Sequence, residues 1–164
     1  MNQGERNETE TSGKEGSEAK VMVVGIGNRL RGDDGVGCEI VTLLQKEKIE
    51  AIDAGAVPEN FIGVIVRKKP ERVLLVDACD FGAPGGEFRL FSSEEIERLN
   101  FKGFSSHTLP LNMFAQLISD TCGAQVWLLG IQPESITLGA GLSAPVAATL
   151  PRVVDFIRQW LKGL

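Results

Sequence analysis

Two aspartates and the only histidine are the residues whose types and positions best suit a chemical site in this 164-residue chain. Asp34 lies in the glycine-rich segment GIGNRLRGDDGVG, Asp77 follows an apolar run in LLVDACDFG, and His107 lies in GFSSHTLPLN. Two carboxylates and one imidazole make an O,O,N ligand set that leaves coordination positions open for a substrate and suits Ni, Zn, Fe or Mn. We therefore predict that these three residues contact a metal.

The count of one histidine also excludes several kinds of site. Zinc proteases of the HExxH type and cages of three histidines need at least two imidazoles within one chain, so neither fits. No GxSxG elbow is present, and Ser105 and Ser106 lie too close in sequence to His107 to indicate a catalytic triad. A Cys79 and His107 pair is an open alternative, and the other interpretation of Cys79 is a thiol packed in the core.

The glycine-rich segment at residues 25–37 does not have the spacing of a nucleotide site. A dinucleotide fingerprint that starts at Gly25 needs a glycine where Leu30 stands, and a P-loop needs Lys and then Ser or Thr where Asp33 and Asp34 stand. Two carboxylates at these positions would repel a phosphate. We interpret the glycines as turn formers that bring both aspartates to the mouth of a crevice. Either aspartate could instead only cap the next helix; we expect Asp33 to cap or orient and Asp34 to face the crevice.

Other polar residues near predicted strand ends are weaker candidates. Asp53 in IDAGAVPEN occupies a position comparable to that of Asp77 but follows a shorter strand. Asp80 has the character of a turn residue, and Asp77 could itself be only a hydrogen-bond acceptor that anchors its loop. The segment GIQP at residues 130–133 either offers backbone donors and acceptors to an extended peptide or is an ordinary strand exit.

The apolar pattern predicts the elements that hold these residues. Short β-branched runs alternate with amphipathic stretches from Val21 onward, which is typical of an α/β fold with a parallel sheet covered by helices on both faces. The predicted strands cover residues 21–27, 49–53, 73–76, 87–91 and 126–131, and the predicted helices cover 35–48, 58–69, 92–99, 109–121 and 143–161. Ligands of open α/β sheets bind beyond the carboxyl ends of the strands, where Asp34 and Asp77 are expected.

Charge and composition narrow the class of protein. The 22 acidic residues exceed the 17 basic ones, and the net charge of −5 argues against nucleic-acid or anionic-membrane partners. The longest apolar runs are shorter than the ~20 residues that span a bilayer. Three cysteines without a CxxC pair indicate a reducing compartment, so we expect a cytoplasmic protein. Residues 1–20 are polar and carry five Glu, so we expect a disordered N-terminal extension before a single domain at residues 21–164.

Residues 21–162 resemble the hydrogenase maturation endopeptidases, which trim a carboxyl-terminal tail from the large subunit of nickel-iron hydrogenases. The resemblance rests on five segments in the family's order and spacing, namely GIGNRLRGDDGVG, IDAGAVPEN, LLVDACDFGAPGGEFRLF, SSHTLPLN and LLGIQP. The PEN, SSHTLPLN and GIQP segments look closest to the branch that matures hydrogenases of the formate-hydrogenlyase type. The resemblance implies a three-layer αβα sandwich with a mostly parallel central sheet of about five strands.

By the same resemblance, the family's metal-contacting residues fall on Asp34, Asp77 and His107, which we take as the catalytic residues too. It implies that nickel arrives with the substrate, already inserted in the immature large subunit, and that no organic cofactor takes part. Our hypothesis is that the three residues dock onto this nickel while a metal-polarised or carboxylate-activated water hydrolyses the scissile peptide. The expected partner is the precursor of a nickel-iron hydrogenase large subunit, and we expect a monomer. The competing interpretation is a non-catalytic nickel-binding chaperone module on the same fold.

Overall fold

The structure is a computed structural model of the chain, and it describes residues 19–99 and 109–163. Residues 1–18 of the predicted extension and His107 lie outside the described residues. The elements in chain order are β1 (Val21–Gly25), the 3-10 helix η1 (Gly32–Gly35), α1 (Val36–Lys46), β2 (Ala51–Asp53), the 3-10 helix η2 (Pro58–Phe61), α2 (Ile62–Lys68), β3 (Arg72–Ala78), β4 (Phe88–Phe91), α3 (Ser93–Arg98), α4 (Leu111–Cys122), β5 (Gln125–Ile131) and α5 (Ala144–Lys162). Within the described residues, none of the helices combines the length and the apolar composition that crossing a bilayer requires.

The strands form one five-stranded sheet in the order β2-β1-β3-β5-β4. β1 pairs in parallel with both β2 and β3, and β3 pairs in parallel with β5, whereas β4 runs antiparallel to β5. β1 and β3 are buried at every position after their first residue, as expected for central strands covered on both faces. The predicted mostly parallel sheet of five strands is confirmed.

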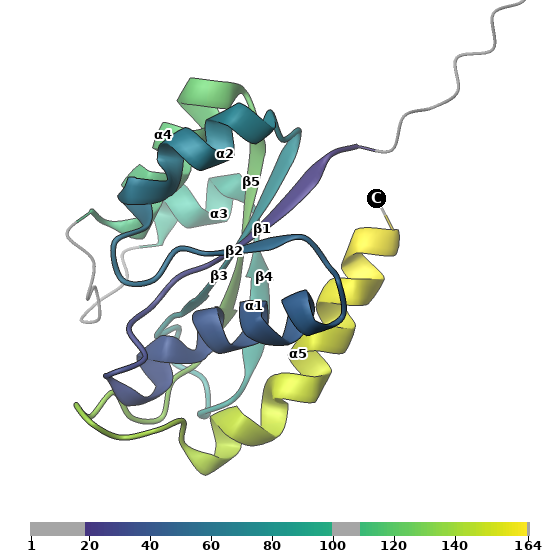
Figure 1. The fold of residues 1–164 in the computed structure, drawn as a ribbon. Helices are drawn as coiled ribbons and strands as arrows, with labels where there is room; N and C mark the ends of the chain where they lie inside the picture. Colours follow the sequence, from purple (N-terminus) through teal and green to yellow (C-terminus); the bar gives the residue numbers. More distant parts are fainter. Residues whose placement is uncertain (1–18, 100–108, 164) are drawn as a thin grey trace, which may run out of the picture.

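The helices form a layer on each face of the sheet (Figure 1): α1 and α5 cover one face, and α2, α3 and α4 cover the other. Alternate residues of β3 therefore enter two separate hydrophobic clusters. Val73 and Leu75 pack in the cluster that contains Phe114 of α4, whereas Leu74 packs in the cluster that contains Ile40 of α1. This arrangement is the predicted three-layer αβα sandwich.

Local sequence sets several helix boundaries near the predicted positions. Ser92 and Glu95 form the expected capping box at the start of α3: the Ser92 N–H donates to Glu95 Oε2 at 2.9 Å, and the Glu95 N–H donates to Ser92 Oγ at 3.3 Å. Lys69, with φ of 49°, ends α2 just before Pro70, and Gly123, with φ of 69°, ends α4. Both helix ends lie within one residue of the predicted ends.

The sheet has a topological switch point between β1 and β3, because the chain leaves β1 towards β2 on one side while β3 lies on the other. Open α/β sheets leave a crevice there, beyond the carboxyl ends of the strands. The start of α1 packs directly against this point: a Cβ on Gly37 would lie 2.1 Å from the Val76 carbonyl oxygen and 2.5 Å from that of Ile26. The segments after β1 and β3 consequently meet at one edge of the sheet.

Candidate active site

Buried polar side chains gather at the carboxyl edge of the sheet. Within residues 19–99 and 109–163, the buried polar or charged side chains are those of Asp33, Asp34, Asp77, Gln132 and Thr149. All of these except Thr149, which lies in α5, stand at or just beyond the ends of β1, β3 and β5. Burying a carboxylate is unfavourable unless hydrogen bonds or a cation compensate it. Three buried aspartates at one edge therefore mark the candidate site.

Asp34 is held in a tight turn between β1 and α1. Gly27, with φ of 140°, allows this turn, because a Cβ at that position would lie 1.8 Å from the Asp34 carbonyl oxygen. The Asn28 N–H donates to Asp34 Oδ2 at 3.1 Å, and Asp34 is only 5% exposed. The turn of the glycine-rich segment thus places the Asp34 carboxylate inside the edge of the sheet.

Asp77 is the penultimate residue of β3 and lies opposite Gly130 in the parallel pairing with β5. It is 3% exposed, and strand alternation places it on the same face as Val73 and Leu75, the face covered by α2, α3 and α4. The chain enters α4 from the segment that contains His107. The sequence placed Asp77 at the end of its strand, and in the structure β3 continues one residue further, to Ala78.

The buried thiol of Cys79 lies near both Asp34 and Asp77, since the charges of both act on it. Cys79 is buried, and its Sγ donates to the Asp77 carbonyl oxygen at 3.8 Å. Burial, together with the negative charges of Asp77 and Asp34, raises the pKa of the Cys79 thiol well above its usual range. A thiol with a raised pKa is a poor nucleophile, which favours the packed-thiol interpretation over a Cys79 and His107 pair.

His107 lies outside the described residues, so its predicted place beside the two aspartates stays a prediction. Within the described residues, no group of three or more His, Cys, Asp or Glu side chains is arranged to hold a metal ion. A metal at this edge would therefore need ligands beyond the carboxylates of Asp34 and Asp77.

Asp33 has a different role from its neighbour. It is fully buried, and its Oδ2 accepts hydrogen bonds from the Glu134 N–H at 2.9 Å, the Ser135 N–H at 3.0 Å and the Ser143 hydroxyl at 2.7 Å. Its Oδ1 accepts from the Ser143 N–H at 2.7 Å. The N-cap of α1 is Gly35, and no side chain caps the helix there, so Asp33 does not cap the following helix and instead orients the segment at residues 134–143. Asp33 fastens the loop between β5 and α5 to the candidate site.

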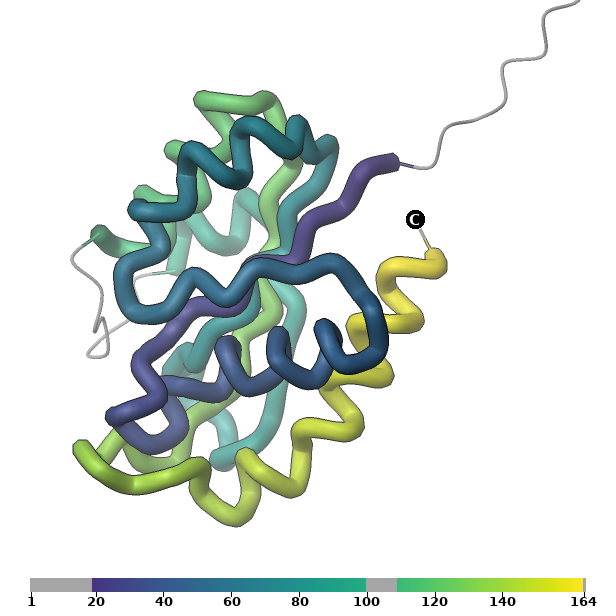
Figure 2. The backbone as a smooth tube through the Cα atoms, in the orientation of Figure 1, coloured from purple at the N-terminus to yellow at the C-terminus, as the bar shows by residue number. Residues whose placement is uncertain are grey.

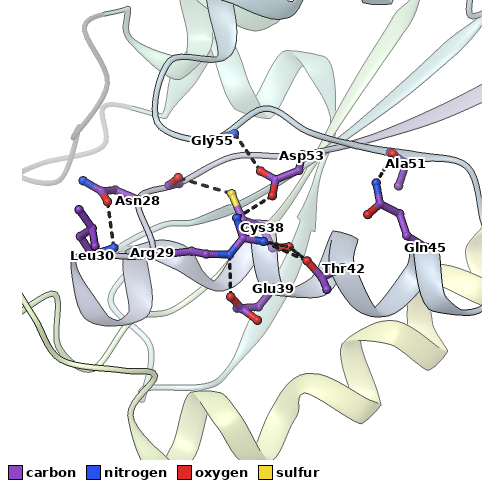
Figure 3. A network of polar contacts seen from close by, with 11 residues as sticks. Asn28, Arg29, Leu30, Cys38, Glu39, Thr42, Gln45, Ala51, Asp53 and Gly55 are labelled. Carbon is purple, nitrogen blue, oxygen red and sulfur yellow. Dashed lines mark hydrogen bonds and ion pairs between the residues drawn. The ribbon is translucent and has the colours of Figure 1, made fainter.

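Arg29 is a structural residue of this edge that sequence reasoning missed (Figure 3). Its guanidinium donates to Asp53 Oδ2 at 2.6 Å, to Glu39 Oε1 at 2.7 Å, and to both the Cys38 carbonyl oxygen and Thr42 Oγ1 at 2.9 Å. Burial alone would raise the pKa of Asp53, but hydrogen bonds from Arg29, Cys38 and the Gly55 N–H outweigh it and lower that pKa. In the sequence, Asp53 has a position at a strand end comparable to that of Asp77, but in the structure Asp53 forms an ion pair with Arg29.

Gln132 is a second residue whose role the sequence did not reveal. Its Oε1 accepts from the N–H groups of Phe81 at 2.9 Å and Ala83 at 3.2 Å, and its Nε2 donates to Asp80 Oδ1 at 3.0 Å. Asp80 also accepts from the Gly82 N–H at 3.1 Å, which confirms it as a turn residue. Gln132 therefore shapes the loop that follows Asp77. The available signal was a single amide directly after an apolar strand, which is too weak to predict a partner.

Known proteins with similar sequences and folds agree on one family. The sequence pattern of the hydrogenase maturation protease family matches residues 38–160. The chain is 33% identical over 141 residues to the hydrogenase 3 maturation protease of Escherichia coli K12, covering 84% of this chain and 86% of that protein.

Solved structures show the same relationship. The [NiFe] hydrogenase maturation protease HycI from Thermococcus kodakarensis superposes with a TM-score of 0.77 at 30% identity, over 90% of this chain and 95% of that one. The endopeptidase HycI from Escherichia coli has a TM-score of 0.75 at 28% identity, over 86% and 90% of the two chains. The chain therefore belongs to the hydrogenase maturation protease family and is a hydrolase of the endopeptidase type.

Proposed function

We propose that this endopeptidase removes the carboxyl-terminal tail from the nickel-loaded precursor of a nickel-iron hydrogenase large subunit. The observation that supports the proposal is that two buried aspartates, Asp34 and Asp77, stand at the carboxyl edge of the sheet and both act on the Cys79 thiol. Carboxylates at a buried edge attract a divalent cation that a substrate presents there. The similarity to a [NiFe] hydrogenase maturation protease supports nickel as that cation.

In this proposal, nickel is part of the substrate. Asp34 and Asp77 contact it from the sheet edge, and His107 contacts it from the segment that leads into α4. The substrate's own ligands complete the coordination shell of the nickel, so three ligands from this chain suffice. The resemblance to the hydrogenase 3 maturation protease supports the formate-hydrogenlyase type of hydrogenase as the source of the precursor.

Hydrolysis of the scissile peptide needs an activated water and stabilisation of the charge that develops on the carbonyl oxygen. In the proposal, one of the two carboxylates accepts the proton of the attacking water while the peptide is fixed beside the nickel. The carboxylates lie where water is largely excluded, so their charges act strongly on bound groups. Asp33 and Gln132 keep the two neighbouring loops in shape and do not touch the reacting atoms.

The test is in vitro processing of purified nickel-loaded precursor, followed by its intact mass. We expect Asp34→Asn, Asp77→Asn and His107→Ala each to lower the processing rate by roughly 100-fold or more, because each removes a contact to nickel or a catalytic base. The matched control is Asp80→Asn, on the same loop as Asp77, because its Oδ1 keeps the acceptor for Gly82 and Gln132. The control is expected to cleave within about threefold of wild type.

Two outcomes would contradict the proposal. Wild-type processing rates in Asp34→Asn and His107→Ala would remove these residues from the reaction. Equal shortening of precursor with and without nickel would remove nickel from substrate recognition. A non-catalytic nickel-holding module instead predicts tight nickel binding by the isolated chain and no loss of mass from the precursor.

A further inference from the structure

Two large apolar side chains protrude from the loops beside the candidate active site. Leu30, between β1 and η1, and Leu138, between β5 and α5, are each 68% exposed, more than any other large apolar side chain in residues 19–99 and 109–163. The Gly139 N–H donates to the Leu30 carbonyl oxygen at 2.7 Å, so the two loops run side by side (Figure 2). The two leucines come from distant parts of the sequence, and their backbones meet at this bond.

The loops that present these leucines are firmly tied together. The Gly32 N–H donates to the Ala140 carbonyl oxygen at 3.1 Å, and the Asp33 N–H donates to that of Ser135 at 2.9 Å. The buried Asp33 carboxylate adds the bonds to the 134–143 segment described above. A pre-organised surface loses little conformational freedom when it binds, which favours affinity. The loops that carry Leu30 and Leu138 are therefore held in fixed positions relative to each other.

Asn28 connects this pair to the catalytic carboxylate. Its side-chain Oδ1 accepts from the Leu30 N–H at 2.9 Å, while its own N–H donates to Asp34 Oδ2 at 3.1 Å. In Figure 3 the Leu30 side chain points away from the Arg29 network. Asn28 therefore fixes the position of Leu30 relative to Asp34, so a protein that binds Leu30 is also held near Asp34.

Single exposed leucines are common on protein surfaces and need no explanation. A rigid pair on the rim of an endopeptidase site is different, because the protein substrate has to approach this edge of the sheet to reach Asp34 and Asp77. Because the leucines protrude, a surface that fits them must contain a recess. An extended peptide tail has no recess, whereas the folded body of a large subunit can offer one.

We propose that Leu30 and Leu138 form a docking pair that inserts into an apolar recess on the folded body of the hydrogenase large-subunit precursor. The inference rests on the proposed function, which supplies the precursor as substrate. The docking pair holds the precursor next to Asp34 and takes no part in the chemical step. It sets the KM for the precursor and leaves kcat unchanged.

The experiment measures steady-state processing of nickel-loaded precursor by Leu30→Ser, Leu138→Ser and the double variant. We expect the KM of the double variant to rise roughly tenfold and its kcat to stay within about twofold of wild type, because interface cores depend on a few apolar anchors. Met113→Ser is the matched control: Met113 is 54% exposed, but it lies on α4. Its KM is expected to stay within about twofold of wild type.

The outcomes separate this inference from the proposed function. Normal processing with an unchanged KM in the double variant, or an equal rise in Met113→Ser, overturns the docking pair alone. If wild type binds the precursor but does not shorten it, and the double variant binds it more weakly, the proposed function is overturned and the docking pair stands. Absence of both binding and shortening by wild type overturns both. A wild-type dimer that the double variant converts to monomer in sedimentation would assign the pair to self-association and overturn the inference.

Discussion

Asp33 and Asp34 are neighbours in sequence with different partners. They lie in the 3-10 helix η1, where successive side chains point about 120° apart because one turn takes three residues. Asp33 is therefore directed to the loop before α5, and Asp34 receives the Asn28 N–H on the β1 side. One residue stabilises the loop before α5, and the other is the residue that we propose takes part in the chemistry.

Asp33→Asn is expected to lower the free energy of unfolding at pH 7 by roughly 2–3 kcal/mol. The substitution removes hydrogen bonds to a charged group, and the asparagine side-chain N–H would point at the N–H donors that bind the carboxylate. Burial alone raises the pKa of Asp33, but hydrogen bonds from Ser135, Ser143 and Glu134 outweigh it and lower that pKa. The stabilisation is therefore complete above the unfolded pKa near 3.8 and disappears as pH falls through the lower folded-state pKa.

Urea unfolding of wild type and Asp33→Asn at neutral and acidic pH measures this effect. The difference between the two proteins should be largest at pH 7 and shrink as the pH is lowered through the folded-state pKa of Asp33. Asp155→Asn is the control, since the ion pair of Asp155 with Arg158 is exposed and is expected to contribute less than about 1 kcal/mol. Equal stability of wild type and Asp33→Asn at pH 7 would contradict the assigned role.

At the scale of elements, α1 and the sheet approach each other closely at the switch point. Gly37 opens the first turn of α1, and Gly25 of β1 faces it: a Cβ on Gly25 would lie 2.4 Å from the Gly37 carbonyl oxygen. The absence of side chains at both positions lets the helix start directly above the strand ends. The Arg29 network then ties α1 to β2 from the outer side (Figure 3).

Two glycine substitutions test this close approach. Gly37→Ala gains roughly 1 kcal/mol of helix propensity but pushes a methyl group into the Val76 and Ile26 carbonyl oxygens, so we expect a net loss of roughly 3 kcal/mol or more. Gly63→Ala in α2 meets only the flexible end of Arg67 at 3.5 Å and is expected to gain roughly 0.5–1 kcal/mol. Chemical denaturation measures both. A stabilised Gly37→Ala protein would show that α1 does not need this approach.

At the scale of the whole molecule, Lys20 joins the first strand to β3, because its carbonyl oxygen accepts from the N–H groups of Glu71 and Arg72. We predict that deletion of residues 1–18, which preserves this contact, changes the free energy of unfolding by less than about 0.5 kcal/mol, because that segment has almost no apolar side chains to bury. Thermal and urea unfolding of the shortened and full-length chains provide the measurement. A large loss of stability would place part of the extension inside the domain.

The sequence by itself determined the fold class, the element order and the positions of Asp34 and Asp77 near strand ends. Apolar periodicity is a local property, and parallel strands bring their carboxyl ends to one edge whatever their order. The tertiary structure decided the partners of the other buried or charged residues. Asp33 binds Ser143, and Gln132 binds the Phe81 N–H, across separations of 110 and 51 residues. No local pattern encodes such contacts, because they exist only once the sheet has placed the loops side by side.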